Sequence, residues 1–147
     1  MSQDDVADTL QEYAEFLRLD GQEGRAHAYD KASRSVRMAG YIPPNPARLD
    51  NVGGSTREAI IDVENGTGID ELSRLRERYS WYDEFKGIQN IGPARAKKIR
   101  DVLGVETLDR LALAARNGDL QEISGIGPKT SSMISSSIET ELQERDV

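Results

Sequence analysis

Apolar residues along the chain recur at the three- and four-residue spacing of helices, and short turns containing Gly or Asn separate the apolar stripes. The first stripe consists of Val6, Leu10, Tyr13 and Leu17. Ser2 and Asp5 precede it at the spacing of a capping box, and Asp20-Gly21 ends it. No segment alternates apolar and polar residues as a half-buried strand would. The pattern therefore predicts an all-helical protein.

Further stripes predict helices over the rest of the chain. The second helix is expected from about Gly24 to Ala39, with an inward face made of Ala28, Ala32, Val36 and Ala39. Later helices are expected over about 54–64, 69–79, 93–103, 107–117 and 128–142. The periodicity breaks at Ser80–Asp83, which divides the chain into expected domains at residues 1–80 and 81–147.

One turn-and-helix pattern occurs three times. IQNIGPARAKKI at residues 88–99 aligns with ISGIGPKTSSMI at 123–134, and LDNVGGSTREAI at 49–60 is a weaker copy without the proline. The connecting segments also align, as GIDELSRL at 68–75 and GVETLDRL at 104–111. Spacings of 39 and 35 residues between copies are typical of structural repeats. We call the turns at residues 49–53, 88–92 and 123–127 the first, second and third hairpins.

The second hairpin shows why such a turn suits an anion. Proline is favoured at the first position of a helix, so Pro93 predicts a helix N-terminus directly after Gly92. Backbone N–H groups at a helix N-terminus lack intrahelical partners, and anions are favoured there. Asn and Gly tolerate the positive φ of a sharp turn, and we expect it at Gly92 and Gly127.

The segments GIGPKT and NIGPARA resemble helix-hairpin-helix motifs, in which an apolar-x-Gly-apolar-Gly turn leads into a helix. The order of the whole chain resembles the N-terminal region of family X DNA polymerases, the family of polymerase beta. That resemblance implies an N-terminal helical domain with a degenerate first hairpin, followed by tandem, SAM-domain-like helix-hairpin-helix motifs. The chain stops where the catalytic domain of that family would begin.

The resemblance also implies sequence-independent binding to the DNA phosphate backbone. The residues expected at that backbone are Gly53, Gly54, Asn90, Ile91, Gly92, Ala94, Arg95, Lys97, Lys98, Gly125, Ile126, Gly127, Lys129 and Thr130. Main-chain carbonyls in the same motifs often hold a monovalent cation, K⁺ or Na⁺. Here they would be those of Lys86, Ile88 and Ile91 and those of Gln121, Ile123 and Ile126. The alternative is that these turns merely join packed helices.

A lyase activity is not expected, although leading domains of family X often remove a 5′-deoxyribose phosphate. Their Schiff-base lysine lies six residues beyond the second glycine of the first hairpin, a position that falls on Ala59 or Ile60. Neither side chain has the primary amine that a Schiff base needs. Two contacts to the 5′-phosphate have counterparts of the same kind in Arg25 and Tyr29. The resemblance thus implies a phosphate pocket whose nucleophile is missing.

The net charge of −7, from 26 acidic and 19 basic residues, opposes binding to a polyanion. However, Lys86 to Arg100 contains five basic residues and no acidic one. Only five of the 19 basic residues are lysine, and this acidic, lysine-poor composition resembles proteins of haloarchaea. An ordinary acidic protein is the alternative. The charge also supports a rival function, a protein–protein adaptor built on degenerate repeats.

The remaining composition narrows the function classes. A single histidine and no cysteine give little support for metal sites or Ser-His triads. No apolar run could span a bilayer, and the N-terminus is not a signal peptide, so we expect a cytoplasmic protein without membrane contact. The expected partner is gapped, nicked or intact duplex DNA in repair or replication, with a polymerase or nuclease as a further partner. A further alternative is that the chain is the N-terminal part of a family X polymerase with a vestigial lyase domain.

Overall fold

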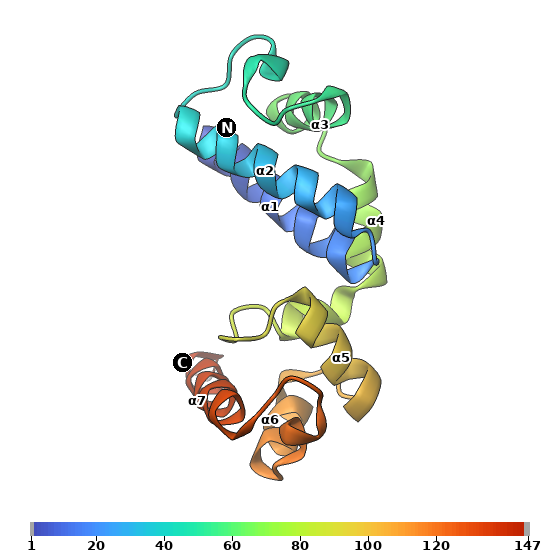
Figure 1. The fold of residues 1–147 in the computed structure, drawn as a ribbon, viewed down its shortest axis with the longest axis vertical. Helices are drawn as coiled ribbons and strands as arrows, with labels where there is room; N and C mark the ends of the chain where they lie inside the picture. Colours follow the sequence, from blue (N-terminus) through green and yellow to red (C-terminus); the bar gives the residue numbers. More distant parts are fainter. Residues whose placement is uncertain (1, 146–147) are drawn as a thin grey trace. The chain divides into compact units, whose positions relative to one another are not determined.

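The structure is a computed structural model that describes residues 2–145. These residues form helices and no strand, as the sequence predicted. The α-helices are α1 (Gln3–Leu19), α2 (Glu23–Ala39), α3 (Gly54–Glu64), α4 (Asp70–Arg78), α5 (Pro93–Leu103), α6 (Leu108–Arg116) and α7 (Pro128–Arg145). Short 3₁₀-helices are η1 (Pro46–Arg48), η2 (Ser80–Glu84) and η3 (Asp119–Glu122). The chain divides into two compact units, Met1–Tyr79 and Ser80–Val147 (Figure 1).

Helix α1 begins with the predicted capping box. The Asp5 N–H donates to Ser2 Oγ at 3.2 Å, and the Ser2 N–H donates to Asp5 Oδ2 at 3.1 Å. These two bonds satisfy N–H groups that would otherwise lack partners at the helix N-terminus.

Helices α1 and α2 lie side by side as an antiparallel pair (Figure 1). The Ser33 hydroxyl fastens them by donating to the Ala7 carbonyl at 2.7 Å, with both residues buried. The inward face of α2 consists of Ala26, Tyr29, Ala32, Ser33 and Val36. The expected placement of Ala28 was therefore wrong, since Ala28 is exposed. Because α2 contains several alanines, its sequence fits more than one possible buried face. The Tyr29 ring packs against that of Tyr13, with centroids 4.6 Å apart, and this contact fixes the face that contains Tyr29.

The core of the second unit is built from residues in and around the two repeated segments. Its fully buried large side chains include Phe85, Ile99, Leu108, Leu111, Leu120, Ile134 and Ile138. At the unit's edge, Arg145 Nη1 donates to Glu84 Oε2 at 3.1 Å, which joins the end of α7 to η2. The second and third hairpins thus share one small core.

The backbone hydrogen bonds show that the three sequence copies adopt one conformation. In each copy two successive turns are closed by an N–H that donates to the carbonyl three residues earlier. The bonds are Leu49 to Pro46 (3.0 Å) and Val52 to Leu49 (3.3 Å), Ile88 to Phe85 (3.3 Å) and Ile91 to Ile88 (3.3 Å), and Ile123 to Leu120 (3.2 Å) and Ile126 to Ile123 (3.1 Å). A helix begins two residues after each second turn. The connectors match as well, because Gly68 and Gly104 both have positive φ, at 76° and 71°.

Within residues 2–145, no helix is both long enough and apolar enough to cross a bilayer.

Candidate nucleic-acid interface

The residue with positive φ in each hairpin lies two positions before the helix-capping glycine. Asn51, Asn90 and Gly125 have φ values of 61°, 68° and 90°. Gly92 is extended, with φ −93° and ψ −176°, and Gly127 also lies outside the positive-φ region. The expectation of positive φ at Gly92 and Gly127 was therefore wrong. A residue that caps a helix N-terminus adopts extended geometry, so the sharp reversal occurs earlier in the turn.

Each capping glycine begins a helix in the same way. The carbonyls of Gly53, Gly92 and Gly127 accept from the N–H groups of Arg57, Ala96 and Ser131, each at 2.9 Å. At the second hairpin no side chain caps the helix, so the N–H groups of Gly92, Ala94 and Arg95 face outward from the end of α5. At the third hairpin, Gly127 and Lys129 are exposed in the equivalent positions.

The first hairpin differs because its cap is already occupied. The Gly53 N–H donates to Thr56 Oγ1 at 2.8 Å. Arg57, the nearest cation, donates to Glu58 Oε1 at 2.8 Å and to Asn45 Oδ1 at 2.9 Å. Gly53 and Gly54 are exposed, but the N-terminus of α3 offers an anion less than the other two hairpins do.

Arg95 connects the second and third hairpins. Its Nη1 donates to the Asn90 carbonyl at 2.6 Å, and its Nη2 donates to the Gly125 carbonyl at 3.4 Å. These two carbonyls belong to the two residues with positive φ. The side chain expected to contact DNA therefore holds two turns together, across a separation of 30 residues that no local pattern in the sequence reveals.

Two open hairpins, built alike and joined by one guanidinium, make up a tandem. Residues 82–140 match the family model of the SAM-like helix-hairpin-helix tandem. Domains of this family commonly bind nucleic acid. No curated protein matches the chain. The predicted resemblance to family X polymerases stays a prediction.

In the tandem, the two repeated segments carry basic residues, and the acidic residues lie outside them. Residues 85–100 and 123–138 contain six basic residues and no acidic one, although the second unit as a whole has 11 acidic and nine basic residues. Lys98 and Lys129 are exposed, and neither forms an ion pair with any residue in 2–145. Lys97 is also exposed. The hairpins of the tandem thus lie in the part of this acidic chain where cations dominate.

The other two cations near the second hairpin have protein partners. Lys86 Nζ lies 3.6 Å from Asp83 Oδ1 and 5.8 Å from the Tyr82 ring centroid. Arg100 donates to Glu106 Oε2 at 2.7 Å, and its guanidinium lies over the Trp81 ring. These contacts stabilise the tandem and leave Lys98 and Lys129 as exposed cations that form no ion pair within residues 2–145.

The carbonyls expected to hold a cation occupy equivalent places in both hairpins of the tandem. Those of Ile88 and Ile123 each accept one turn N–H, which leaves a second lone pair on each oxygen. Neutral carbonyl oxygens are suitable ligands for K⁺ or Na⁺. In the chemistry of their donors, the set from Lys86, Ile88 and Ile91 and the set from Gln121, Ile123 and Ile126 therefore suit such an ion.

The expected 5′-phosphate contacts lie in a hydrogen-bonded polar cluster of the first unit, in which Arg25 is exposed and Tyr29 is buried. Arg25 Nη1 donates to Glu71 Oε2 at 2.7 Å, and Arg25 Nη2 donates to the Tyr13 hydroxyl at 2.9 Å. That hydroxyl donates to Glu71 at 2.8 Å. Burial raises the pKa of Tyr13, and its bond to Glu71 raises the pKa further. Tyr29 is 5% exposed. Because Arg25 pairs with Glu71, a phosphate at Arg25 would have to compete with the Glu71 carboxylate.

The position expected for a lyase nucleophile is buried. Ala59 is 6% exposed and Ile60 is fully buried. Among residues 2–145, no group of three His, Cys, Asp or Glu side chains is arranged to hold a metal ion.

Proposed function

We propose that this chain is a sequence-independent DNA-binding module in repair or replication, which holds the phosphate backbone at its second and third hairpins. The observation that supports this proposal most strongly is the pair of glycine-capped helix N-termini, at Gly92 and Gly127, in segments free of acidic residues. Two anion sites joined by Arg95 suit a ligand with regularly spaced charges. Because phosphates carry no base identity, such contacts bind all sequences alike.

Each hairpin has a distinct part in this proposal. Backbone N–H groups at the starts of α5 and α7 donate to phosphate oxygens, while Lys98 and Lys129 add positive charge. A K⁺ or Na⁺ ion at the carbonyl sets would add positive charge beside the phosphate. The first hairpin contributes little, because Thr56 already accepts from the Gly53 N–H.

We propose no enzymatic activity for the module. Schiff-base chemistry requires an amine beside the first hairpin, and Ala59 and Ile60 supply none. Borohydride reduction of a mixture with DNA carrying a 5′-deoxyribose phosphate should trap no covalent adduct. A stoichiometric adduct on any lysine would overturn this part of the proposal. A polymerase or nuclease would supply the chemistry that follows binding.

Three matched glycine substitutions test the binding proposal. A β-carbon at Gly53, Gly92 or Gly127 meets no atom within 4 Å, and none of the three has positive φ, so valine should be accommodated in each. Gly92→Val and Gly127→Val place a branched side chain where a phosphate would approach. Loss of hydrogen bonds to a charged group costs about 1.5–3 kcal/mol, so duplex affinity should fall roughly 10- to 100-fold.

Gly53→Val is the control and should bind DNA like the wild type. Circular dichroism checks that each variant is folded, and fluorescence anisotropy with two unrelated duplexes measures affinity. If folded Gly92→Val and Gly127→Val bind as tightly as the wild type, the hairpins are not phosphate sites. The net charge of −7 would then favour the protein–protein adaptor.

A further inference from the structure

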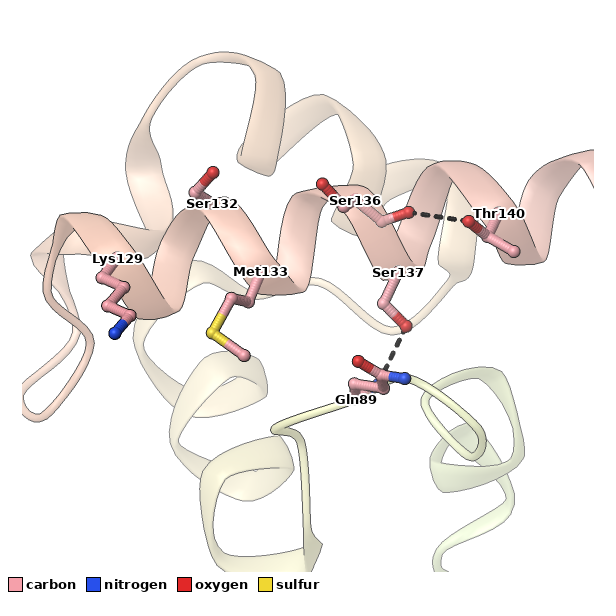
Figure 2. Close-up of a pocket in the computed structure, with 7 residues that line it drawn as sticks. All are labelled: Gln89, Lys129, Ser132, Met133, Ser136, Ser137 and Thr140. Atoms are coloured by element: carbon pink, nitrogen blue, oxygen red, sulfur yellow. Dashed lines mark hydrogen bonds between the residues drawn. The ribbon is translucent and has the colours of Figure 1, made fainter.

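A groove of about 510 Å³ runs along α7 beside the segment that carries Gln89 (Figure 2). Gln89 directly precedes Asn90 of the second hairpin, and Lys129 is the second residue of α7, just after the third hairpin. The groove is therefore next to both hairpins of the tandem. Its volume lies within the range of about 300–1,000 Å³ that is common for ligand sites.

The groove lining combines one cation with neutral hydrogen-bonding groups. It contains Lys129, the amide of Gln89, several hydroxyls and one thioether, and no carboxylate. The Gln89 backbone N–H donates to Ser137 Oγ at 2.9 Å, which holds this segment against α7. The Gln89 side-chain amide makes no hydrogen bond within the described residues and can both donate and accept.

Met133 provides an apolar surface in the middle of the groove. Its side chain is 45% exposed, whereas Ile134 beside it in the chain is fully buried in the core. Lys129, Met133 and Ser137 follow one another at four-residue intervals, about 6 Å of helix rise per step. Figure 2 shows Met133 and Ser137 on the side of α7 nearest Gln89. A thioether packs favourably against the face or edge of an aromatic ring.

This order of groups matches the parts of one nucleotide. Lys129 suits the phosphate, Met133 suits the face of the base, and the Gln89 amide with the Ser137 hydroxyl suits its polar edge. Beyond the far end of the groove, the Glu141 carboxylate lies near Gly87, where it disfavours a phosphate. The groove thus favours one orientation, with the phosphate next to the third hairpin. A paired base is stacked on both faces and cannot enter.

We infer that this groove holds one unpaired nucleotide of a DNA strand whose backbone is bound at the third hairpin. The inference rests on the proposed function and narrows it to DNA with an end, a gap or a flap. Blunt duplex would bind through the hairpins alone.

Binding measurements with four labelled DNAs test the inference. The first probe is a blunt duplex. The other three are the same duplex with one unpaired thymidine, placed at a 5′ end, at a 3′ end, or on the intact strand opposite a one-nucleotide gap. We expect at least one unpaired probe to bind roughly 2- to 10-fold more tightly than the blunt duplex. Met133→Ala should abolish this difference without changing affinity for the blunt duplex, and Gln89→Ala should reduce the difference.

Leu113→Ala is a matched control, because Leu113 is an exposed apolar residue of α6 outside the groove. It should keep the preference for the unpaired probe. A 2-aminopurine at the unpaired position should change its fluorescence on binding to the wild type and not on binding to Met133→Ala. If the blunt duplex binds and no unpaired probe binds more tightly, the groove inference is wrong and the proposed function stands. If none of the four DNAs binds, the proposed function itself is wrong.

Discussion

Replacing Arg95 with lysine separates a bridge between hairpins from a simple phosphate ligand. Lysine keeps the positive charge but lacks the planar fork with which Arg95 reaches the carbonyls of Asn90 and Gly125. If Arg95 acts as the bridge, Arg95→Lys should be nearly as damaging as Arg95→Ala. If Arg95 is instead a phosphate ligand, Arg95→Lys should bind DNA almost like the wild type.

The hydrogen-bond geometry sets the size of the effect. A hydrogen bond from a charged donor contributes about 1.5–3 kcal/mol, and partial exposure of Arg95 places the 2.6 Å bond to Asn90 at the lower end. The 3.4 Å bond to Gly125 is long and adds less. We therefore expect each variant to lower the free energy of unfolding of the second unit by about 1–2 kcal/mol. Misalignment of the two hairpins should weaken duplex binding about tenfold.

Urea denaturation followed by the fluorescence of Trp81 measures stability, since Trp81 is the single tryptophan and lies in the second unit. Fluorescence anisotropy with a blunt duplex measures affinity at one fixed salt concentration. Lys98→Arg is the matched control. It also replaces one type of cation by the other on α5, but at a position whose side chain does not contact a hairpin carbonyl. A folded Arg95→Lys variant with wild-type stability and wild-type affinity would refute the bridging role.

Three further predictions concern charge. Lys98→Ala should weaken binding to all duplexes alike and make the slope of log K against log salt shallower by about 0.9, from a wild-type slope of about −2 to −4; an unchanged slope would remove Lys98 from the interface. If the acidic surface is a halophilic adaptation, thermal midpoints should rise from low to molar KCl, and a flat or falling midpoint would mark an ordinary acidic protein. Burial raises the pKa of Glu71, but hydrogen bonds from Arg25 and Tyr13 outweigh it and hold that pKa below its ordinary value of 4.5. The stability that Glu71 contributes is therefore present above pH 4.5 and lost as pH falls below it. Between pH 6 and pH 3 the melting temperature of Glu71→Gln should decline less than that of the wild type. An equal decline in the two proteins would contradict this.

The repeats could be predicted from the sequence because their determinants are local. Each hairpin depends on a residue that tolerates positive φ, an extended capping glycine and a helix directly after it, all within a few positions. The copies at 49–60, 88–99 and 123–134 accordingly fold alike. Locating the positive φ needed the cap geometry, and so the expectation fell on Gly92 instead of Asn90.

Contacts between distant residues could not be predicted in the same way. The charge of Arg95 suggested a phosphate ligand, and nothing near it indicated a partner at Gly125. The pairing of Arg25 with Glu71 joins α2 to α4, and so the carboxylate that competes for the expected phosphate contact is brought there only by the packing of the helices. The groove beside Gln89 likewise forms only when the second hairpin contacts α7.

The net charge of −7 and the proposed binding to a polyanion are compatible because screening makes electrostatics local. At physiological ionic strength the Debye length is about 8 Å, so a phosphate at a hairpin interacts mainly with the charges nearest to it. In the tandem, residues 85–100 and 123–138 carry six cations and no carboxylate, although Asp83 and Glu106 pair with Lys86 and Arg100. The first hairpin instead contains Asp50 and is followed by Glu58, and the Gly53 N–H at its cap donates to Thr56. Charge placement and hydrogen bonding therefore select the same two hairpins, although the two properties arise from different residues.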